Sequence, residues 1–145
     1  MIHPDVHSVN VHPSSPNAVI APTGGGLYVS SDGGARWQRL YRCYCRAVWV
    51  DPGRADHMVF GPADSVDENG RIEETHNAGE TWERADEGLD TAWPRHMVER
   101  FLEVDGELLA VLSNGELIAA PLDTLKWRSV IPAVQQVNAV AALEM

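Results

Sequence analysis

The sequence predicts an all-β chain made of repeated four-stranded antiparallel units, and three observations support this fold class. Tryptophans recur at a constant interval of 45 residues, at Trp37, Trp82 and Trp127. Stretches of alternating apolar residues are separated by tight-turn dipeptides, such as Asp-Gly at 105–106 and Asn-Gly at 114–115. Helical periodicity is weak throughout the chain. One tryptophan per unit of about 40 to 45 residues is typical of the blades of a β-propeller.

The strands are expected where apolar stretches lie between turns. In the first unit these stretches are residues 6–11, 18–21, 27–30 and 37–41, and the breaks between them are residues 13–17, 24–26 and 32–34. The three blades are therefore predicted at about residues 5–41, 45–86 and 97–131. One extra closing strand is predicted at about residues 137–143, because this apolar stretch resembles the first strand of a unit.

Two polar turns precede the first two tryptophans with the same spacing. They are Ser30-x-Asp32-x-Gly34-x-x-Trp37 and Thr75-x-Asn77-x-Gly79-x-Thr81-Trp82, whereas the third unit keeps Trp127 but not the polar turn. This pattern resembles the Asp-box, or BNR repeat, Ser/Thr-x-Asp-x-Gly-x-Thr-Trp. Proteins with this repeat include sialidases, other glycoside hydrolases, sortilin-type receptors and photosystem II assembly factors, all of them β-propellers. The resemblance implies that the residues of both boxes, and Trp127, are structural and not catalytic.

The composition is acidic. The chain has 11 lysines and arginines against 21 aspartates and glutamates, a formal net charge of −10. Such a chain repels phosphate backbones and anionic lipid surfaces, so neither nucleic acid nor a membrane is expected as a partner. No apolar run approaches the roughly 20 residues of a membrane-spanning helix, and the first residues have no signal-peptide pattern. A cytoplasmic location is expected.

No metal site and no cofactor are predicted. Cys43 and Cys45 are separated by a single residue, and no second cysteine pair completes a ligand set. His3, His7 and His12 have no spacing typical of a metal site.

Ligands of propellers bind at the mouth, which is formed by the loops between the second and third strands and between successive blades. The loop at residues 61–71 is longer than its counterparts in the other units and carries the candidate catalytic carboxylates Asp64, Asp67 and Glu68. Further candidates for ligand binding in these loops are Arg42, Tyr44, Arg46, Arg71, Trp93, Arg95 and His96. The ring of Trp93 is either a platform for a sugar or a peptide, or a cap on the neighbouring blade.

The function predicted from these features is that of a non-catalytic binding or assembly module acting through its mouth, with a small carbohydrate or peptide as ligand. The alternative is a sialidase-like glycoside hydrolase that uses the acidic loop, although no sialidase active-site motif can be matched residue by residue. Three blades cannot close a ring that usually has four to eight. The expected partner is therefore a second copy, giving a six-bladed homodimer, or the remainder of a longer propeller.

Overall fold

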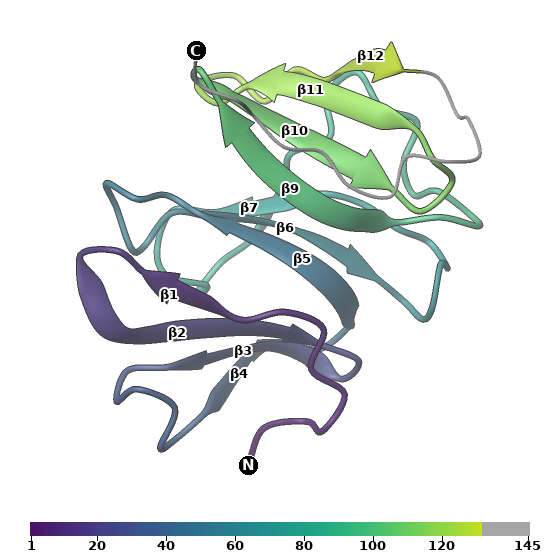
Figure 1. The fold of residues 1–145 in the computed structure, drawn as a ribbon. Helices are drawn as coiled ribbons and strands as arrows, with labels where there is room; N and C mark the ends of the chain where they lie inside the picture. The colour runs from purple at the N-terminus through teal and green to yellow at the C-terminus, as the bar shows by residue number, and fades with distance from the viewer. Residues whose placement is uncertain (132–145) are drawn as a thin grey trace.

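The computed structural model describes residues 1–131 of the 145-residue chain, and all regular structure in this part is β-strand. The strands form three four-stranded antiparallel sheets, which are stacked one above another in Figure 1. The prediction of an all-β fold with three four-stranded units is therefore confirmed. The closing strand predicted at residues 137–143 lies outside the described residues.

Each sheet is a meander in which every strand pairs with the next one along the chain. The first sheet contains β1 (Asn10–His12), β2 (Ser15–Thr23), β3 (Gly26–Ser30) and β4 (Gln38–Tyr41). The second contains β5 (Tyr44–Val50), β6 (Met58–Ala63), β7 (Glu73–Thr75) and β8 (Glu83–Arg84). The third contains β9 (Val98–Val104), β10 (Glu107–Leu112), β11 (Leu117–Pro121) and β12 (Arg128–Ile131).

The two hairpin dipeptides of the third sheet form different turns. Asp105 and Gly106 both have positive φ, 49° and 78°, and Glu107 pairs directly with Val104 across a two-residue turn. In the next hairpin only Gly115 has positive φ, 88°, and the side chain of Asn114 instead accepts a hydrogen bond from the backbone N–H of Glu116. Asn-Gly therefore marks a hairpin here as expected, but a longer one in which asparagine caps its own turn.

The two polar turns have the same bonding. In the second turn, Thr75 Oγ1 accepts a hydrogen bond from the N–H of Gly79 at 2.9 Å, and Asn77 Oδ1 accepts one from Thr81 N–H at 2.9 Å. The first turn has the equivalent bonds, of 2.9 and 2.8 Å, from Gly34 N–H to Ser30 Oγ and from Arg36 N–H to Asp32 Oδ1. Both glycines have φ between 87° and 99°, a conformation that side chains disfavour.

Two apolar clusters fill the spaces between the sheets. The cluster between the first and second sheets contains Ile20, Leu27, Cys45, Val48, Met58 and Phe60. The cluster between the second and third sheets is larger and includes Val59, Ile72, Val98, Leu108, Leu112, Ile118 and Trp127. The second sheet therefore has an apolar layer on each of its faces, to which β6 contributes the fully buried Met58, Val59 and Phe60.

The recurring tryptophans occupy related positions. Trp82 packs against the first cluster, with its ring 5.8 Å from that of Tyr41 in the preceding sheet. Trp127 is 5% exposed, and its Nε1 donates to the backbone oxygen of Ala85, again in the preceding sheet. Trp37 directly precedes β4 of the first sheet and is half-buried. The tryptophan of the second and third units therefore packs each sheet onto the one before it.

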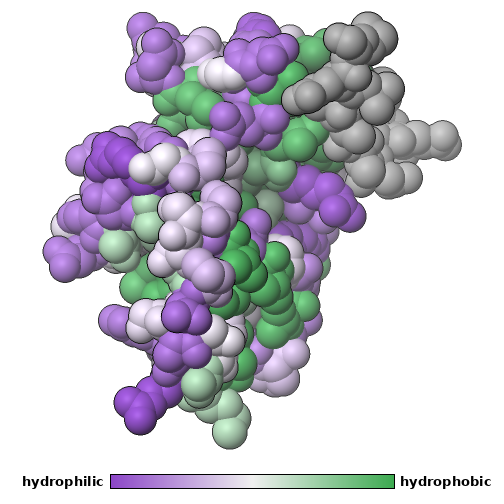
Figure 2. Space-filling model, turned by 60° about the vertical axis from the view of Figure 1, so that its left-hand side comes forward, coloured by the Kyte–Doolittle hydropathy of each residue, from purple (hydrophilic) through white to green (hydrophobic). Residues whose placement is uncertain are grey.

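The first strands of the three sheets lie towards a common side of the stack, where β5 contacts both β1 and β9 (Figure 1). On the face shown in Figure 2, apolar atoms gather at the height of β1. On and just before β1, Val9 and Val11 are more than half exposed, at 59% and 54%. Residues 1–131 contain no helix long and apolar enough to cross a membrane.

Candidate functional site

The long loop between β6 and β7 is held in place by backbone hydrogen bonds. Asp64 N–H donates to the oxygen of Glu68 at 2.8 Å, which turns the loop back on itself. Gly70 and Trp93 then exchange two backbone hydrogen bonds, of 3.1 and 2.8 Å, which tie the loop to the connection between β8 and β9. Gly70 has no room for a side chain, because an added Cβ would lie 2.3 Å from the oxygen of His96. The acidic loop is therefore an ordered part of the mouth.

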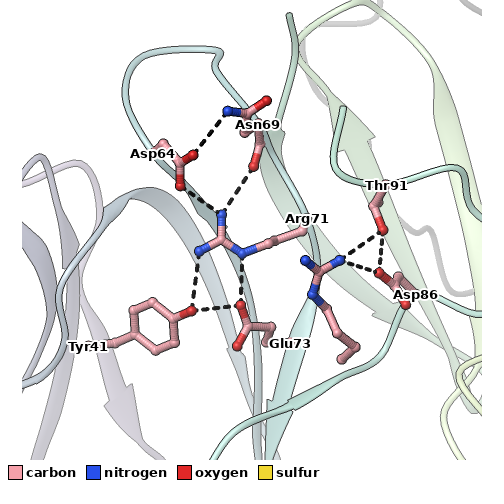
Figure 3. A network of polar contacts seen from close by, with 8 residues as sticks. Tyr41, Asp64, Asn69, Arg71, Glu73, Asp86 and Thr91 are labelled. Carbon is pink, nitrogen blue, oxygen red and sulfur yellow. Dashed lines mark hydrogen bonds and ion pairs between the residues drawn. The ribbon is translucent and has the colours of Figure 1, made fainter. Parts of the chain in front are cut away.

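Arg71 is the centre of a polar network at the base of this loop (Figure 3). Its Nε donates to Glu73 Oε2 at 2.9 Å, and its Nη1 donates to Asp64 Oδ1 at 3.1 Å. Its Nη2 donates to the hydroxyl oxygen of Tyr41 at 3.2 Å, and the hydroxyl donates in turn to Glu73 Oε2 at 2.7 Å. Because Tyr41 belongs to the first sheet and Glu73 to the second, this network joins the two sheets.

The environment of the network fixes its charges. Burial opposes the charge of Arg71, but the hydrogen bonds with Tyr41 and Glu73 outweigh it and raise the pKa of the guanidinium. The hydrogen bond from Asn69, together with Arg71, lowers the pKa of the Asp64 carboxyl. Burial raises the pKa of Tyr41. Around neutral pH Arg71 is therefore cationic, Asp64 is anionic and Tyr41 keeps its proton.

A second arginine network lies between the mouth and the inner strands. Nη1 of Arg46, on β5, donates to Asp67 Oδ1 at 2.8 Å and to Glu99 Oε1 of β9 at 2.6 Å. The guanidinium carbon lies 5.2 Å from the centre of the Tyr44 ring, and the edge of that ring meets His7 at 5.0 Å. The network therefore holds the tip of the acidic loop against the second and third sheets.

Two cavities adjoin these networks. The first has a volume of about 450 Å³ and lies between the inner strands, where it is lined by His7, Asn10, Arg46, Glu99, Arg100 and Phe101. The second has a volume of about 530 Å³ and lies at the mouth between the first two sheets, where Arg42, Tyr44 and Asp64 line it together with His3 and Arg39. Both are open, charged spaces that a small polar ligand could enter.

Trp93 and His96 lie away from these cavities. Trp93 is 6% exposed and belongs to the cluster between the second and third sheets, so its ring is not an exposed platform. His96 stacks on it at 4.9 Å, and burial lowers its pKa. Arg95 and Glu68 are exposed to solvent.

The two cysteines lie side by side at the start of β5, Cys45 buried and Cys43 partly so. A hydrogen bond with Cys45, and burial, raise the pKa of the Cys43 thiol. The thiol therefore keeps its proton at neutral pH, which disfavours a role in metal binding or nucleophilic catalysis.

Several residues of these networks were not among the sequence candidates. Glu73, Glu99 and Tyr41 lie on strands, where alternation alone makes a charged or aromatic residue look like an ordinary surface position. The cluster of His57, Glu74 and His76 was also missed, because His57 is far from the other two residues in sequence and meets them only through the pairing of β6 with β7. It lies at the other end of β6 and β7, where the strands are farthest from the mouth. Only the register of the strands brings these residues together.

Comparison with known proteins gives the fold. No family model matches the sequence, and no curated protein matches it. Among solved structures, an ancestral GH74 enzyme is 18% identical with a TM-score of 0.68, covering 84% of this chain and 18% of that chain. The GH74 xyloglucanase from Xanthomonas campestris is 16% identical with a TM-score of 0.65, covering 91% of this chain and 23% of that chain. YCF48 from Cyanidioschyzon merolae is 13% identical with a TM-score of 0.61, and the match covers 89% of this chain and 38% of that chain.

These neighbours are β-propellers, so the three sheets described above are propeller blades. The chain spans less than two fifths of the length of each of these proteins. It corresponds to part of their rings.

Proposed function

We propose that the chain is a non-catalytic propeller segment that acts as a binding or assembly module through its mouth and inner cavity. The observation that supports this most directly is that Asp64 and Asp67 each accept a hydrogen bond from an arginine. Hydrolysis of a glycoside needs one carboxyl group with a raised pKa as the proton donor. The pKa of Asp64 is instead lowered. In this proposal the acidic loop positions Arg46 at the inner cavity, where it is one of the binding groups.

The ligand that fits this surface best is a small carbohydrate or peptide with a carboxylate. Arginine side chains bind carboxylates through two parallel hydrogen bonds, and aromatic rings pack against sugar rings or apolar side chains. Arg42 and Tyr44 at the mouth, and Arg46 and Arg100 at the inner cavity, supply both kinds of group.

The two polar turns support a relationship to Asp-box propellers. Their side chains and glycines have the bonds and φ angles that a structural turn of this kind requires. They lie between the third and fourth strands of their sheets, at the end opposite the mouth. In this proposal they stabilise the blades and take no part in binding.

We further propose that a second copy completes the ring, with the remainder of a longer propeller as the alternative partner. Two copies of three blades give six, within the range of known propellers. The partial coverage of the neighbouring propellers is consistent with a need for further blades. The exposed Val9 and Val11 at the first sheet are apolar side chains that an added blade would cover.

Two measurements test the proposal. Light scattering after gel filtration should give about twice the 15.9 kDa of one chain; a soluble monomer at micromolar concentration would contradict the homodimer. A screen of fluorogenic sialosides and common glycosides should show no turnover. The alternative function is a glycoside hydrolase, the activity of the GH74 enzymes among the structural neighbours. Turnover that Asp67→Ala or Glu68→Ala abolishes would establish that alternative and overturn the binding module.

A further inference from the structure

Three side chains of the types that bind metal ions converge at the end of the second sheet farthest from the mouth. The donor atoms of His57, Glu74 and His76 all lie within 4.8 Å of one another. His57 Nε2 is 2.7 Å from Glu74 Oε2, and His76 Nε2 is 3.4 Å from Glu74 Oε1. The two imidazole rings are stacked, 4.5 Å apart and nearly parallel.

The strand register brings these residues together. Met58 pairs with Thr75 and Val59 pairs with Glu74. Extending this ladder by one residue places His57 opposite His76. Because side chains two residues apart on a strand share a face, Glu74 and His76 point to the same side of the sheet. The convergence therefore follows from Glu74 on β7 and from His57 and His76, which directly flank the paired strands β6 and β7.

A further carboxylate orients His57. Its Nδ1 is 2.9 Å from Asp51 Oδ2, and Asp51 is itself held by a hydrogen bond from the N–H of Gly53 at 2.8 Å. The edge of the Trp49 ring packs against the imidazole at 5.3 Å. A histidine that binds a metal through one nitrogen typically donates its other N–H to a carboxylate in this way, which fixes the tautomer and the direction of the free lone pair.

The close contact between His57 and Glu74 needs a proton or a metal ion between the two donor atoms. A neutral imidazole has only one N–H, and an ionised carboxylate can only accept hydrogen bonds. If Nδ1 of His57 donates to Asp51, the lone pair of Nε2 faces an oxygen of Glu74 at 2.7 Å. Two lone pairs repel at this distance unless a proton or a metal ion lies between them.

We propose that His57 Nε2, the carboxylate of Glu74 and His76 Nε2 bind a divalent transition-metal ion, with Zn²⁺ as the reference ion. Two imidazoles and one carboxylate are a donor set that suits zinc and its neighbours, whereas calcium and magnesium prefer oxygen ligands alone. Ligand atoms about 2.0 to 2.1 Å from a tetrahedral zinc are about 3.3 Å apart. His76 Nε2 lies 3.4 Å from Glu74 Oε1, close to this value, whereas His57 Nε2 lies 2.7 Å from the other oxygen, Oε2, so His57 and the carboxylate move apart when the ion binds.

The exposed side chain of His76 leaves the cluster accessible to an ion from solvent. The side chain of His76 is 54% exposed, whereas those of Glu74 and His57 are 18% and 10% exposed. His76 can therefore turn to admit the ion and water can take a fourth position, while β7 holds Glu74 and the contact with Asp51 holds His57. The expected effect of the metal is to link the start of β6 to the end of β7, next to the second polar turn. This role is independent of ligand binding at the mouth.

The matching positions in the other blades show that the blade fold does not need this cluster. At the interval of 45 residues that relates the blades, Glu74 and His76 correspond to Val29 and Ser31 in the first, and to Ala119 and Pro121 in the third. The first and third blades form the same four-stranded antiparallel sheet without them.

The test is zinc binding by the untagged full chain after treatment with a chelator. Calorimetric titration with ZnCl₂ should give one ion per chain, and saturating zinc should raise the melting temperature by several degrees, an effect that the chelator reverses. His76→Gln and Glu74→Gln should each weaken zinc binding at least tenfold. His3→Gln, which changes a histidine outside the cluster, should bind zinc like the wild type, and calcium should not bind at the site.

Cobalt gives a second, spectroscopic measurement. Co²⁺ in a site with two nitrogen ligands and low coordination number should give visible absorption that zinc displaces and that His76→Gln abolishes. Because His76 is largely exposed, His76→Gln should fold normally, which circular dichroism checks. The proposal is overturned if folded wild-type chain binds no zinc at millimolar concentration, or if His76→Gln and Glu74→Gln both bind zinc as tightly as the wild type.

Discussion

The substitution Arg71→Met removes the cation that joins the first and second blades while keeping an apolar stem of similar length. In the wild type, Arg71 donates hydrogen bonds to the side chains of Glu73, Asp64 and Tyr41. Asp64 is exposed and can be solvated once the guanidinium is gone, whereas Glu73 is only 7% exposed. The main cost of the substitution is therefore one buried carboxylate without its positive partner.

The burial of Glu73 sets how much Arg71→Met should lower the free energy of unfolding. Removing one partner of a buried ion pair costs about 3–5 kcal/mol. The lower end applies here, because Tyr41 still donates a hydrogen bond to Glu73 and because the Arg71 side chain is 15% exposed. We expect the free energy of unfolding to fall by about 3 kcal/mol. For a domain of this size, that corresponds to a decrease in melting temperature of about 10 °C.

Urea denaturation followed by circular dichroism measures this change. Arg95→Met serves as the control, because Arg95 is exposed, and it should alter stability by less than about 0.5 kcal/mol. Adding Glu73→Gln to Arg71→Met should restore part of the loss, since the buried group is then uncharged. If Arg71→Met is as stable as Arg95→Met, the network does not hold the blades together and the argument fails.

Three further predictions concern the turns and the charges. Gly88→Ala should destabilise the chain by at least about 2 kcal/mol more than Gly106→Ala in thermal unfolding. Both glycines have positive φ, but only at Gly88 would the added Cβ meet a backbone oxygen, that of Trp127, at 2.4 Å. Thr75→Val should cost about 1–2 kcal/mol in urea denaturation, and Thr75→Ser much less, because serine keeps the hydroxyl that accepts two backbone hydrogen bonds. The pKa of Asp64 is lower in the folded chain than its ordinary value of 3.8, so the ionised carboxyl stabilises the fold above pH 3.8. This stabilisation is lost as the pH falls through the folded pKa. Asp64→Asn should therefore make the free energy of unfolding depend less on pH in acid.

The repeat and the turns could be predicted because they depend on neighbours in sequence. A dipeptide such as Asp105-Gly106 specifies its own backbone conformation, and the 45-residue interval of the tryptophans marks equivalent places in successive blades. The contacts between blades could not be predicted in the same way. Arg46 and Glu99 are 53 residues apart and meet only because β5 packs beside β9. Trp93 occurs in a polar connection, and only the pairing with Gly70 shows that it belongs to the core.

Comparison of matching positions in the three blades distinguishes residues that every blade needs in order to fold from charged residues that occur only in the second blade. Residues that a blade needs in order to fold should recur at the same position in each blade, as Leu27, Ile72 and Leu117 do. The positions that match Glu73 in the other blades are instead occupied by Tyr28 and Ile118. A buried carboxylate is a cost in a fold that works without it, and it is retained only where a partner stabilises it and where it serves a purpose. The Arg71 network is therefore a stabilising contact between blades, whereas the histidine cluster at the other end of the second blade is where, under the zinc proposal, substitutions should change metal binding before they abolish folding.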